Sequence, residues 1–330
     1  MRHYLPPPPA GLHLVDHARA DAATVAIADE RARHWRSPHP GELRPGTIEH
    51  SRAVAAMFRD TFNPYKPSII DWPRLDAEAL ARLTSLPIWD IAVQTEGRAR
   101  IRMLSYAHSV ADPAWRGALE LNAWEEGRHK HVLANLVEAY GIALAPEPPY
   151  PAPRLKLWAY LVTGFSECID SFFAFGLFRL AERSGYFPPE LVETFEPVMQ
   201  EEGRHILLFA NWLAWYRATM PWWRRPGFEL MVAAVWLFLA WERVGLARGI
   251  EGGAAEDANF AVTGSQARSD EEVTLTGLLA LCLEENDRRF AYYDARLKRP
   301  SFMPWAARTV LRLMGKRDKR AASLGAAKRA

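Results

Sequence analysis

The sequence predicts an all-α protein whose centre is a bundle of four long helices. Four long segments with a helical distribution of apolar side chains follow one another between residues 84 and 217. Two short breaks that contain proline divide these segments into pairs, and a longer proline-rich linker separates the pairs. Because short breaks join antiparallel neighbours, this order favours two helical hairpins connected by one long crossover.

The first hairpin is predicted to contain helices over residues 84–109 and 113–140, and the second over residues 154–183 and 188–217. The linker, GIALAPEPPYPAP at 141–153, should be extended, and at about 3.1 Å per residue it spans roughly 40 Å. A helix of about 27 residues has nearly the same length at about 1.5 Å per residue. The third helix can therefore start beside the start of the second.

One pentapeptide, Glu-Glu-Gly-Arg-His, occurs on both the second and the fourth predicted helix. Residues three apart on a helix lie one turn from each other on adjoining faces, so the second Glu and the His of each copy can point at one centre. A single Glu-x-x-His is weak evidence of a metal site, but a repeated one is much stronger. The four residues are Glu126, His129, Glu202 and His205.

A single carboxylate also lies on the helix that precedes each copy, Glu96 before the first and Glu167 before the second. Glu167 has phenylalanine neighbours and small residues on its own helix face, which could leave a cavity. A carboxylate in such surroundings must be protonated, paired with a cation or bound to a metal. The small residues on this face are Gly164, Ser171 and Ala174, whereas the residues on the face of Glu96 are predicted to be core: Trp89, Val93, Ala99 and Met103.

One Glu from each of two helices and a Glu-x-x-His from each of two others form the ligand set of ferritin-like di-iron and di-manganese proteins. Over roughly residues 84–217 the chain resembles this superfamily. The form Glu-Glu-x-Arg-His looks like soluble di-iron oxygenases and acyl-carrier-protein desaturases. The resemblance implies a ferritin-like bundle with a long crossover between its second and third helices. It also implies six metal ligands: Glu96, Glu126, His129, Glu167, Glu202 and His205.

The resemblance further implies roles for the residues beside the ligands. A metal-bound imidazole usually donates its other ring N–H to a carboxylate. We therefore expect Glu125 to orient His205 and Glu201 to orient His129, although exposed surface pairs are the simpler alternative. Two arginines would complete this network: Arg128 and Arg204.

The donor set predicts the kind of metal. Carboxylate and imidazole ligands suit iron or manganese, and the lack of cysteine pairs argues against structural zinc. We expect two iron ions, with a mixed manganese and iron centre left open. The resemblance implies that Glu126 and Glu202 bridge the two ions and are the catalytic ligands, with O2 as co-substrate and a reductase or ferredoxin as external electron donor.

These expectations lead to one main hypothesis and three alternatives. The main hypothesis is an O2-dependent di-iron oxygenase that hydroxylates, N-oxygenates or desaturates a mainly apolar or aromatic small molecule. The first alternative is a ferroxidase, an iron-storage protein or a rubrerythrin-like peroxidase. A hydroxylase of a modified tRNA nucleoside and a non-catalytic helical scaffold are less favoured.

The sequence outside the bundle predicts further helices at 12–35, at 47–62 with Thr47 as N-cap, and at 73–83 with Pro73 in its first turn. We expect these to pack on the bundle. A helix pair is predicted at 228–249 and 270–296. The resulting organisation has an N-terminal segment at 1–83, the bundle at 84–217, the helix pair at 218–297 and a tail at 298–330.

Part of the predicted helix pair resembles the repeated motif without its histidine. In the run Glu284 to Arg289, Arg288 stands where a ligand would be needed. We interpret this run as structural ion pairs. It does not predict a third metal position.

The tail carries most of the positive charge. Residues 298–330 contain ten Lys and Arg against one acid, whereas the rest of the chain has 31 basic and 38 acidic residues. This tail could be disordered, or it could form an amphipathic helix that contacts a membrane, an acidic partner or RNA.

Composition predicts a cytoplasmic protein. The two cysteines are too few for a disulfide framework, and the N-terminus has no continuous apolar segment typical of a signal peptide. The longest apolar run, Leu230–Trp241, has 12 residues, fewer than the roughly 18 to 20 that span a bilayer. A homodimer is left open.

Overall fold

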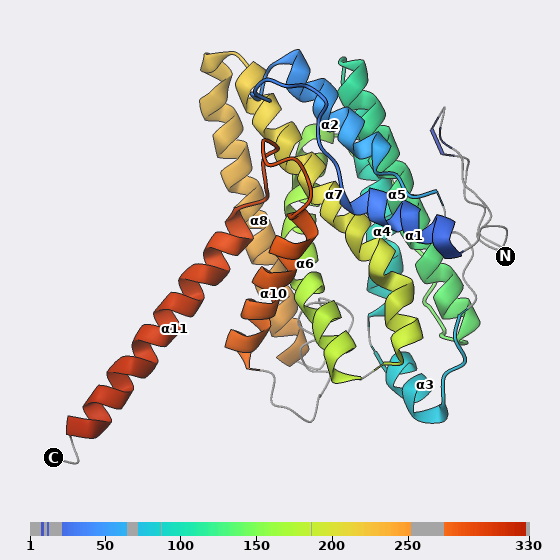
Figure 1. Ribbon diagram of the computed structural model, residues 1–330, viewed down its shortest axis with the longest axis vertical. Helices are drawn as coiled ribbons and strands as arrows, with labels where there is room; N and C mark the ends of the chain where they lie inside the picture. Colours follow the sequence, from blue (N-terminus) through green and yellow to red (C-terminus); the bar gives the residue numbers. More distant parts are fainter. Residues whose placement is uncertain are drawn as a thin grey trace.

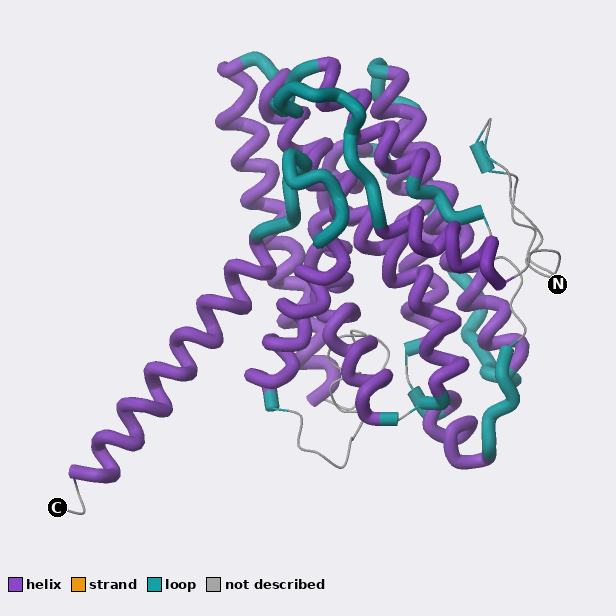
Figure 2. Tube along the Cα trace, in the orientation of Figure 1, coloured by secondary structure: helices purple, strands orange, loops and turns teal. Residues whose placement is uncertain are grey.

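The fold is helical in every named element of the residues that the computed structural model describes, which are 8–9, 12, 22–64, 72–86, 88–185, 187–251 and 274–327. Figures 1 and 2 show long helices packed side by side, with loops mainly at their ends. The one β-type pairing in these ranges is an isolated bridge between Trp35 and Tyr293. The all-α prediction is therefore confirmed.

Four helices form the central bundle: α4 (Trp89–Ala107), α5 (Pro113–Ala139), α6 (Lys156–Ser184) and α7 (Pro189–Thr219). Helix α4 packs on α5 and α6, and α7 packs on α6 and α5. The connection from Tyr140 to Leu155 contains no helix, as predicted for the crossover. Helix α4 begins later than expected because Leu86 precedes a proline, which disfavours helical backbone at that residue.

Local capping explains where the bundle helices begin and end. Asp112 accepts hydrogen bonds from the backbone N–H groups of Ala114 and Trp115 at 2.9 and 3.1 Å, which fixes the start of α5. Helix α7 begins directly after Pro188. At the end of α6, Gly185 adopts a left-handed φ of 62°, which glycine tolerates and which ends the helix. The two predicted hairpins follow from these signals.

Three helices precede the bundle: α1 (Ala22–Arg33), α2 (Ile48–Asp60) and α3 (Ala77–Thr84). Thr47 caps α2 as predicted, accepting from the His50 N–H at 3.3 Å. The prediction for α3 was wrong at its start, because Asp76 caps the helix and Pro73 lies before it. Of the helix predicted at 12–35, residues 13–21 lie outside the described residues. Helix α2 packs on α5 and α7.

The C-terminal part contains a short 3-10 turn at Trp222–Arg224 followed by α8 (Arg225–Glu251), α10 (Leu275–Phe290) and α11 (Phe302–Ala327). The two helices of the predicted pair, α8 and α10, each pack on α6, as Figure 1 also shows. The described part of the tail is helical, because α11 continues as one helix that extends away from the bundle (Figure 1).

The ion pairs predicted around α10 are present and connect it to the bundle. Arg289 binds Glu196 of α7 at 2.9 Å, and Arg288 binds the buried Glu285 at 2.7 Å. Arg179 of α6 lies 3.5 Å from Glu285. The structural interpretation of this run is confirmed.

Helix α6 has the length and apolar composition of a membrane-spanning segment, and it alone does so among the described residues. Within its most apolar 18-residue window, 61% is buried inside the protein. This composition also suits a central core helix, and α6 lies in that position, in contact with α4, α7, α8 and α10.

Candidate metal centre

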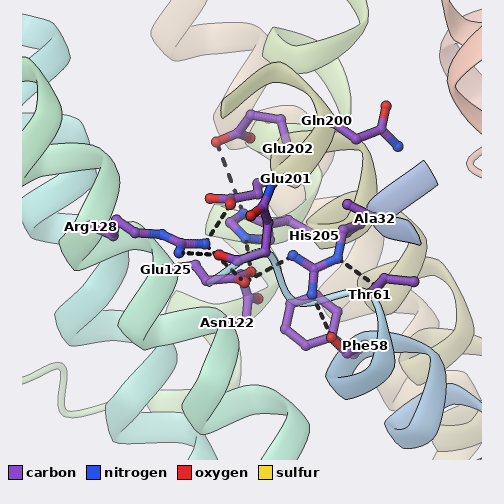
Figure 3. Close-up of polar contacts among 12 residues, drawn as sticks. Ala32, Phe58, Thr61, Asn122, Glu125, Arg128, Gln200, Glu201, Glu202 and His205 are labelled. Atoms are coloured by element: carbon purple, nitrogen blue, oxygen red, sulfur yellow. Dashed lines mark hydrogen bonds and ion pairs between the residues drawn. The ribbon is translucent and has the colours of Figure 1, made fainter. Parts of the chain in front are cut away.

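Four potential ligands converge between α5 and α7. Glu126 and His129 project from α5, and Glu202 and His205 project from α7. One ligand atom of each residue lies within 4.8 Å of all the others, and at least three of the four side chains are fully buried. These side chains could hold a metal ion. Figure 3 shows Glu202 and His205 facing the residues of α5.

The two remaining carboxylates predicted from the sequence also face this cluster. Glu96 of α4 lies 3.9 Å from Nδ1 of His129 and interacts with Glu126. Both carboxylate oxygens of Glu167 on α6 are buried without a hydrogen-bond partner. The negative charges of Glu126 and Glu202 raise the pKa of this carboxyl group. The structure thus brings four of the predicted ligands, Glu126, His129, Glu202 and His205, into one cluster, with Glu96 close to His129.

Each imidazole is held by its Nε2 atom. Nε2 of His129 lies 2.8 Å from an oxygen of Glu201, and Nε2 of His205 lies 2.9 Å from an oxygen of Glu125. These are the cross-bundle pairs expected from the sequence. Since a carboxylate accepts the proton of Nε2–H, this contact favours the tautomer in which Nδ1 carries the free lone pair.

The free Nδ1 atoms point at carboxylates without forming hydrogen bonds. Nδ1 of His205 is 2.8 Å from an oxygen of Glu126, and Nδ1 of His129 is 3.0 Å from an oxygen of Glu202, yet neither nitrogen has an aligned partner. Two donor atoms bound at about 2.1 Å and at a right angle to one ion would be about 3.0 Å apart. The observed contacts are therefore compatible with ligation of one ion by both atoms of each pair.

Each imidazole lies close to the carboxylate of the opposite helix. For His205, Nδ1 is 2.8 Å from Glu126 but 3.9 Å from Glu202 in its own motif. The sequence suggested that each Glu-x-x-His pair would serve one centre. The structure instead pairs Nδ1 of each imidazole most closely with the carboxylate of the opposite helix, and the two ring centroids are 5.2 Å apart.

Two fully buried arginines surround the orienting carboxylates. Arg204 donates to Glu125 at 2.9 Å, and Arg128 donates to Glu201 (Figure 3). Burial alone would raise the pKa of Glu125, but the positive charges of Arg204 and His205 hold it well below its usual value. These four residues are not an exposed surface pair. Glu125, Arg128 and Arg204 have no exposed surface, and Glu201 is 2% exposed.

The remaining carboxylates lack such cations. Burial raises the pKa of Glu96 and of Glu167 well above the usual range, and the charge of Glu126 raises both further. Burial lowers the pKa of an imidazole, yet the charge of Glu126 and the bond to Glu125 raise the pKa of His205 to about 9. The ligand set contains no Arg or Lys, so its negative charge is balanced by protons on these groups or by divalent cations that displace those protons.

Sequence reasoning missed several residues that hold this site. Asn122 donates to Glu126 at 3.2 Å, and Ser171 donates to Glu202 at 3.1 Å. Both could have been found, because Asn122 precedes Glu126 by one helical turn and Ser171 follows Glu167 by one. The partners of the arginines carry no such signal. They come from the N-terminal segment: the Thr61 hydroxyl and Phe58 carbonyl for Arg204, and the Asn63 carbonyl for Arg128.

The cavity expected beside Glu167 is not present at Gly164. A Cβ atom at that position would lie 2.2 Å from the ring of Phe209, so the phenylalanine fills the space that glycine leaves. The core residues predicted around Glu96 are all buried: Trp89, Val93, Ala99 and Met103.

Comparison with known proteins adds no assignment to this geometry: no protein-family profile, no curated protein and no solved structure matches the chain.

Proposed function

We propose that the protein is an O2-dependent di-iron oxidoreductase that acts on a mainly apolar small molecule. One observation carries the proposal. Two buried imidazoles, each fixed at Nε2 by a carboxylate, direct Nδ1 atoms without hydrogen-bond partners toward the carboxylates of Glu126 and Glu202. This donor set, rich in oxygen and without thiolate, is one that iron and manganese prefer.

Six residues would hold the two ions. Glu126 and Glu202, whose carboxylates lie 2.8 and 3.0 Å from Nδ1 of the imidazole on the opposite helix, would be shared by the two ions, and the other four would each bind one. Two ferrous ions at this position would supply two electrons to O2 without a strained oxidation state on either ion. The terminal ligands would be Glu96, His129, Glu167 and His205.

The protein's own groups prepare this site for ligation. Glu125 and Glu201 accept hydrogen bonds from the Nε2–H groups of the two imidazoles. The proton of each imidazole therefore stays on Nε2, and the Nδ1 lone pairs are available to a metal. Asn122 and Ser171 fix the rotamers of the two bridging carboxylates. Apolar rings next to the site, including Phe58 at 5.9 Å from the His205 ring, exclude water and lower the local dielectric.

The apolar substrate class rests on the phenylalanine-rich surroundings of Glu167. An external reductase or ferredoxin would be required to return the ions to the ferrous state. A second candidate is peroxide reduction or iron oxidation without an organic substrate. This candidate is favoured by the Phe209 ring, which fills the space beside Gly164 where a substrate would otherwise fit.

The test begins with apo-protein loaded anaerobically with ferrous iron and then exposed to O2. We expect rapid O2 uptake that the variant Glu202→Ala lacks. The control variant Glu284→Ala removes an exposed carboxylate of α10 and should behave as wild type. If the loaded protein consumes O2 no faster than free ferrous iron, the proposal fails. If hydrogen peroxide oxidises the loaded protein faster than O2 does, the second candidate is correct.

A further inference from the structure

The outward face of α8 is apolar and exposed. Leu230, Leu237 and Trp241 are 72%, 72% and 71% exposed, and their spacing places them along one side of the helix. No charged residue occurs from Leu230 to Trp241. We refer to these three residues, with Trp222 and Trp223, as the α8 face.

The opposite side of α8 already forms the contact with the bundle. Phe228, Val232, Val235 and Leu239 are buried, and α8 packs on α6. The helix is therefore apolar on both sides, although only one side is needed for folding. A continuous exposed apolar patch of this kind usually marks an interaction surface.

The exposed apolar surface includes residues before and after α8 in the chain. Trp222 and Trp223, in the 3-10 turn that precedes α8, are 75% and 64% exposed. On α11, Trp305 is 62% exposed and follows Phe302, whose ring lies 4.3 Å from the ring of Trp236 on α8. Figure 1 shows α8 and α11 on the same side of the molecule, away from α1 and α3.

Basic residues border this apolar surface. Arg224 and Arg225 follow the two tryptophans at the start of α8, and Arg312 is exposed on α11. The only acid near the start of the α8 face, Glu229, is bound by Arg217 through two contacts of 2.8 Å. Apolar side chains bordered by tryptophan and arginine match the interface of a membrane that contains anionic lipids.

Other occupants fit this pattern less well. A second copy of the chain on the same face would bring two segments together that each carry ten basic residues and one acid in positions 298–330. Nucleic acid would satisfy the arginines but would leave the leucines and tryptophans of the α8 face exposed to water. A bilayer surface accommodates both groups.

We propose that the α8 face and the exposed side of α11 dock on the surface of a bilayer that contains anionic phospholipids. The helices lie on the lipid and do not cross it. Leu230, Leu237 and the tryptophans enter the interfacial region, while the arginines contact lipid phosphates. The proposal does not depend on the metal cluster, which lies on the other side of α6.

Vesicle flotation of the full-length chain tests the proposal. We expect the protein to float with vesicles of phosphatidylcholine and phosphatidylglycerol, more weakly with phosphatidylcholine alone, and less at high salt, because ions screen the arginine contacts. Absence of flotation with the anionic vesicles would overturn the proposal.

Two double variants separate the apolar contact from a change in charge. Leu230→Glu with Leu237→Glu changes the α8 face, and Ile27→Glu with Ile48→Glu adds the same charge at residues 70% and 55% exposed on α1 and α2. We expect the first variant to reduce the vesicle partition coefficient at least about tenfold and the second to reduce it about twofold or less. Equal losses in both variants would overturn the proposal.

Two further outcomes would assign the surface to another occupant. The α8 variant could convert a wild-type dimer to a monomer in sedimentation analysis while wild type fails to bind vesicles. The wild type could instead bind tRNA with a steep salt dependence and ignore vesicles. Either result contradicts a lipid-docking surface. Circular dichroism of each variant verifies that the fold is retained.

Discussion

At the scale of single residues, the site depends on which imidazole nitrogen carries the proton and on which carboxylates have an arginine partner. Each imidazole is held by a carboxylate, and each of these carboxylates is held by a buried arginine. The ligand carboxylates have no arginine partner. A carboxylate without a counter-charge in such a site is either protonated or bound to a cation, so a metal that binds there must displace protons.

The first prediction concerns Glu201. Glu201→Gln removes the charge that orients His129 and leaves Arg128 without its main counter-ion. We expect ferrous affinity to fall about 10- to 100-fold, since supporting partners of metal ligands have effects of this size. Equilibrium ferrous binding under anaerobic conditions measures it.

A matched control distinguishes this effect from general loss of a buried charge. Glu285 is also buried and paired with an arginine, but it lies in the α10 network. Glu285→Gln should lower stability and leave ferrous affinity unchanged. Equal affinity losses in the two variants would show that Glu201 has no specific role.

At the scale of helices, α6 is the element on which the others pack. Its glycines permit two close approaches, one to the Phe209 ring and one to α10. At Gly176, a Cβ atom would lie 2.4 Å from the Cys282 sulfur and 2.9 Å from its backbone nitrogen. The backbone of α10 cannot move aside as a flexible side chain can. The close packing of α10 on α6 therefore requires a glycine at position 176.

The second prediction follows from this contact. Gly176→Ala should destabilise the protein by about 1–3 kcal/mol through overpacking. Gly117→Ala on α5, where nothing lies within 4 Å of the added atom, should stabilise it by up to about 1 kcal/mol through helix propensity. Urea unfolding midpoints measure both changes. A stabilised Gly176→Ala variant would contradict the close packing of α6 and α10.

The third prediction concerns the ion pair between α7 and α10. Burial would raise the pKa of Glu196, but the charge and hydrogen bonds of Arg289 lower it from 4.5 to about 2. Because the folded pKa is below the unfolded one, this group stabilises the protein fully above pH 4.5 and loses its effect as pH falls toward 2.

Glu196→Gln should therefore lower stability at neutral pH by about 1–2 kcal/mol and flatten the acid dependence over that interval. Thermal unfolding at a series of pH values measures it. An unchanged slope would show that Glu196 does not contribute to acid unfolding.

The helices also show what the sequence could and could not predict. The bundle and its crossover were predictable because proline, Asp112 and Gly185 fix helix ends locally. The four residues of the cluster were predictable because helical spacing places the Glu and the His of each motif on adjoining faces of one helix. The packing of α8 and α10 on α6 was not predictable. The pattern of apolar residues shows which face of a helix is buried, but it does not show which other helix covers that face. The contact between Gly164 and Phe209 was missed for the same reason.

At the scale of the whole molecule, the bundle depends on the segment before it. Thr61, Phe58 and Asn63 supply the acceptors that hold Arg204 and Arg128. No sequence pattern indicates these contacts, because they join residues more than 60 positions apart. The N-terminal helices are thus part of the site's support.

The fourth prediction tests this dependence. A fragment of residues 84–217 keeps Glu125 and Glu201 but lacks the acceptors of Thr61, Phe58 and Asn63, so both buried arginines lose part of their hydrogen bonds, which is destabilising. We expect the fragment to unfold without a cooperative transition and to bind ferrous iron at least about tenfold more weakly than the full chain. Calorimetry and anaerobic iron binding measure these properties. A cooperatively folded fragment with full affinity would show that the N-terminal segment is dispensable.

We propose that six side chains of one bundle bind two ions, and anaerobic ferrous titration of the full-length apo-protein is the decisive test. We expect saturation at two ions per folded chain, with loss of both in the variant His129→Ala with His205→Ala. Saturation below one ion per folded chain, or unchanged binding in that variant, would contradict the claim.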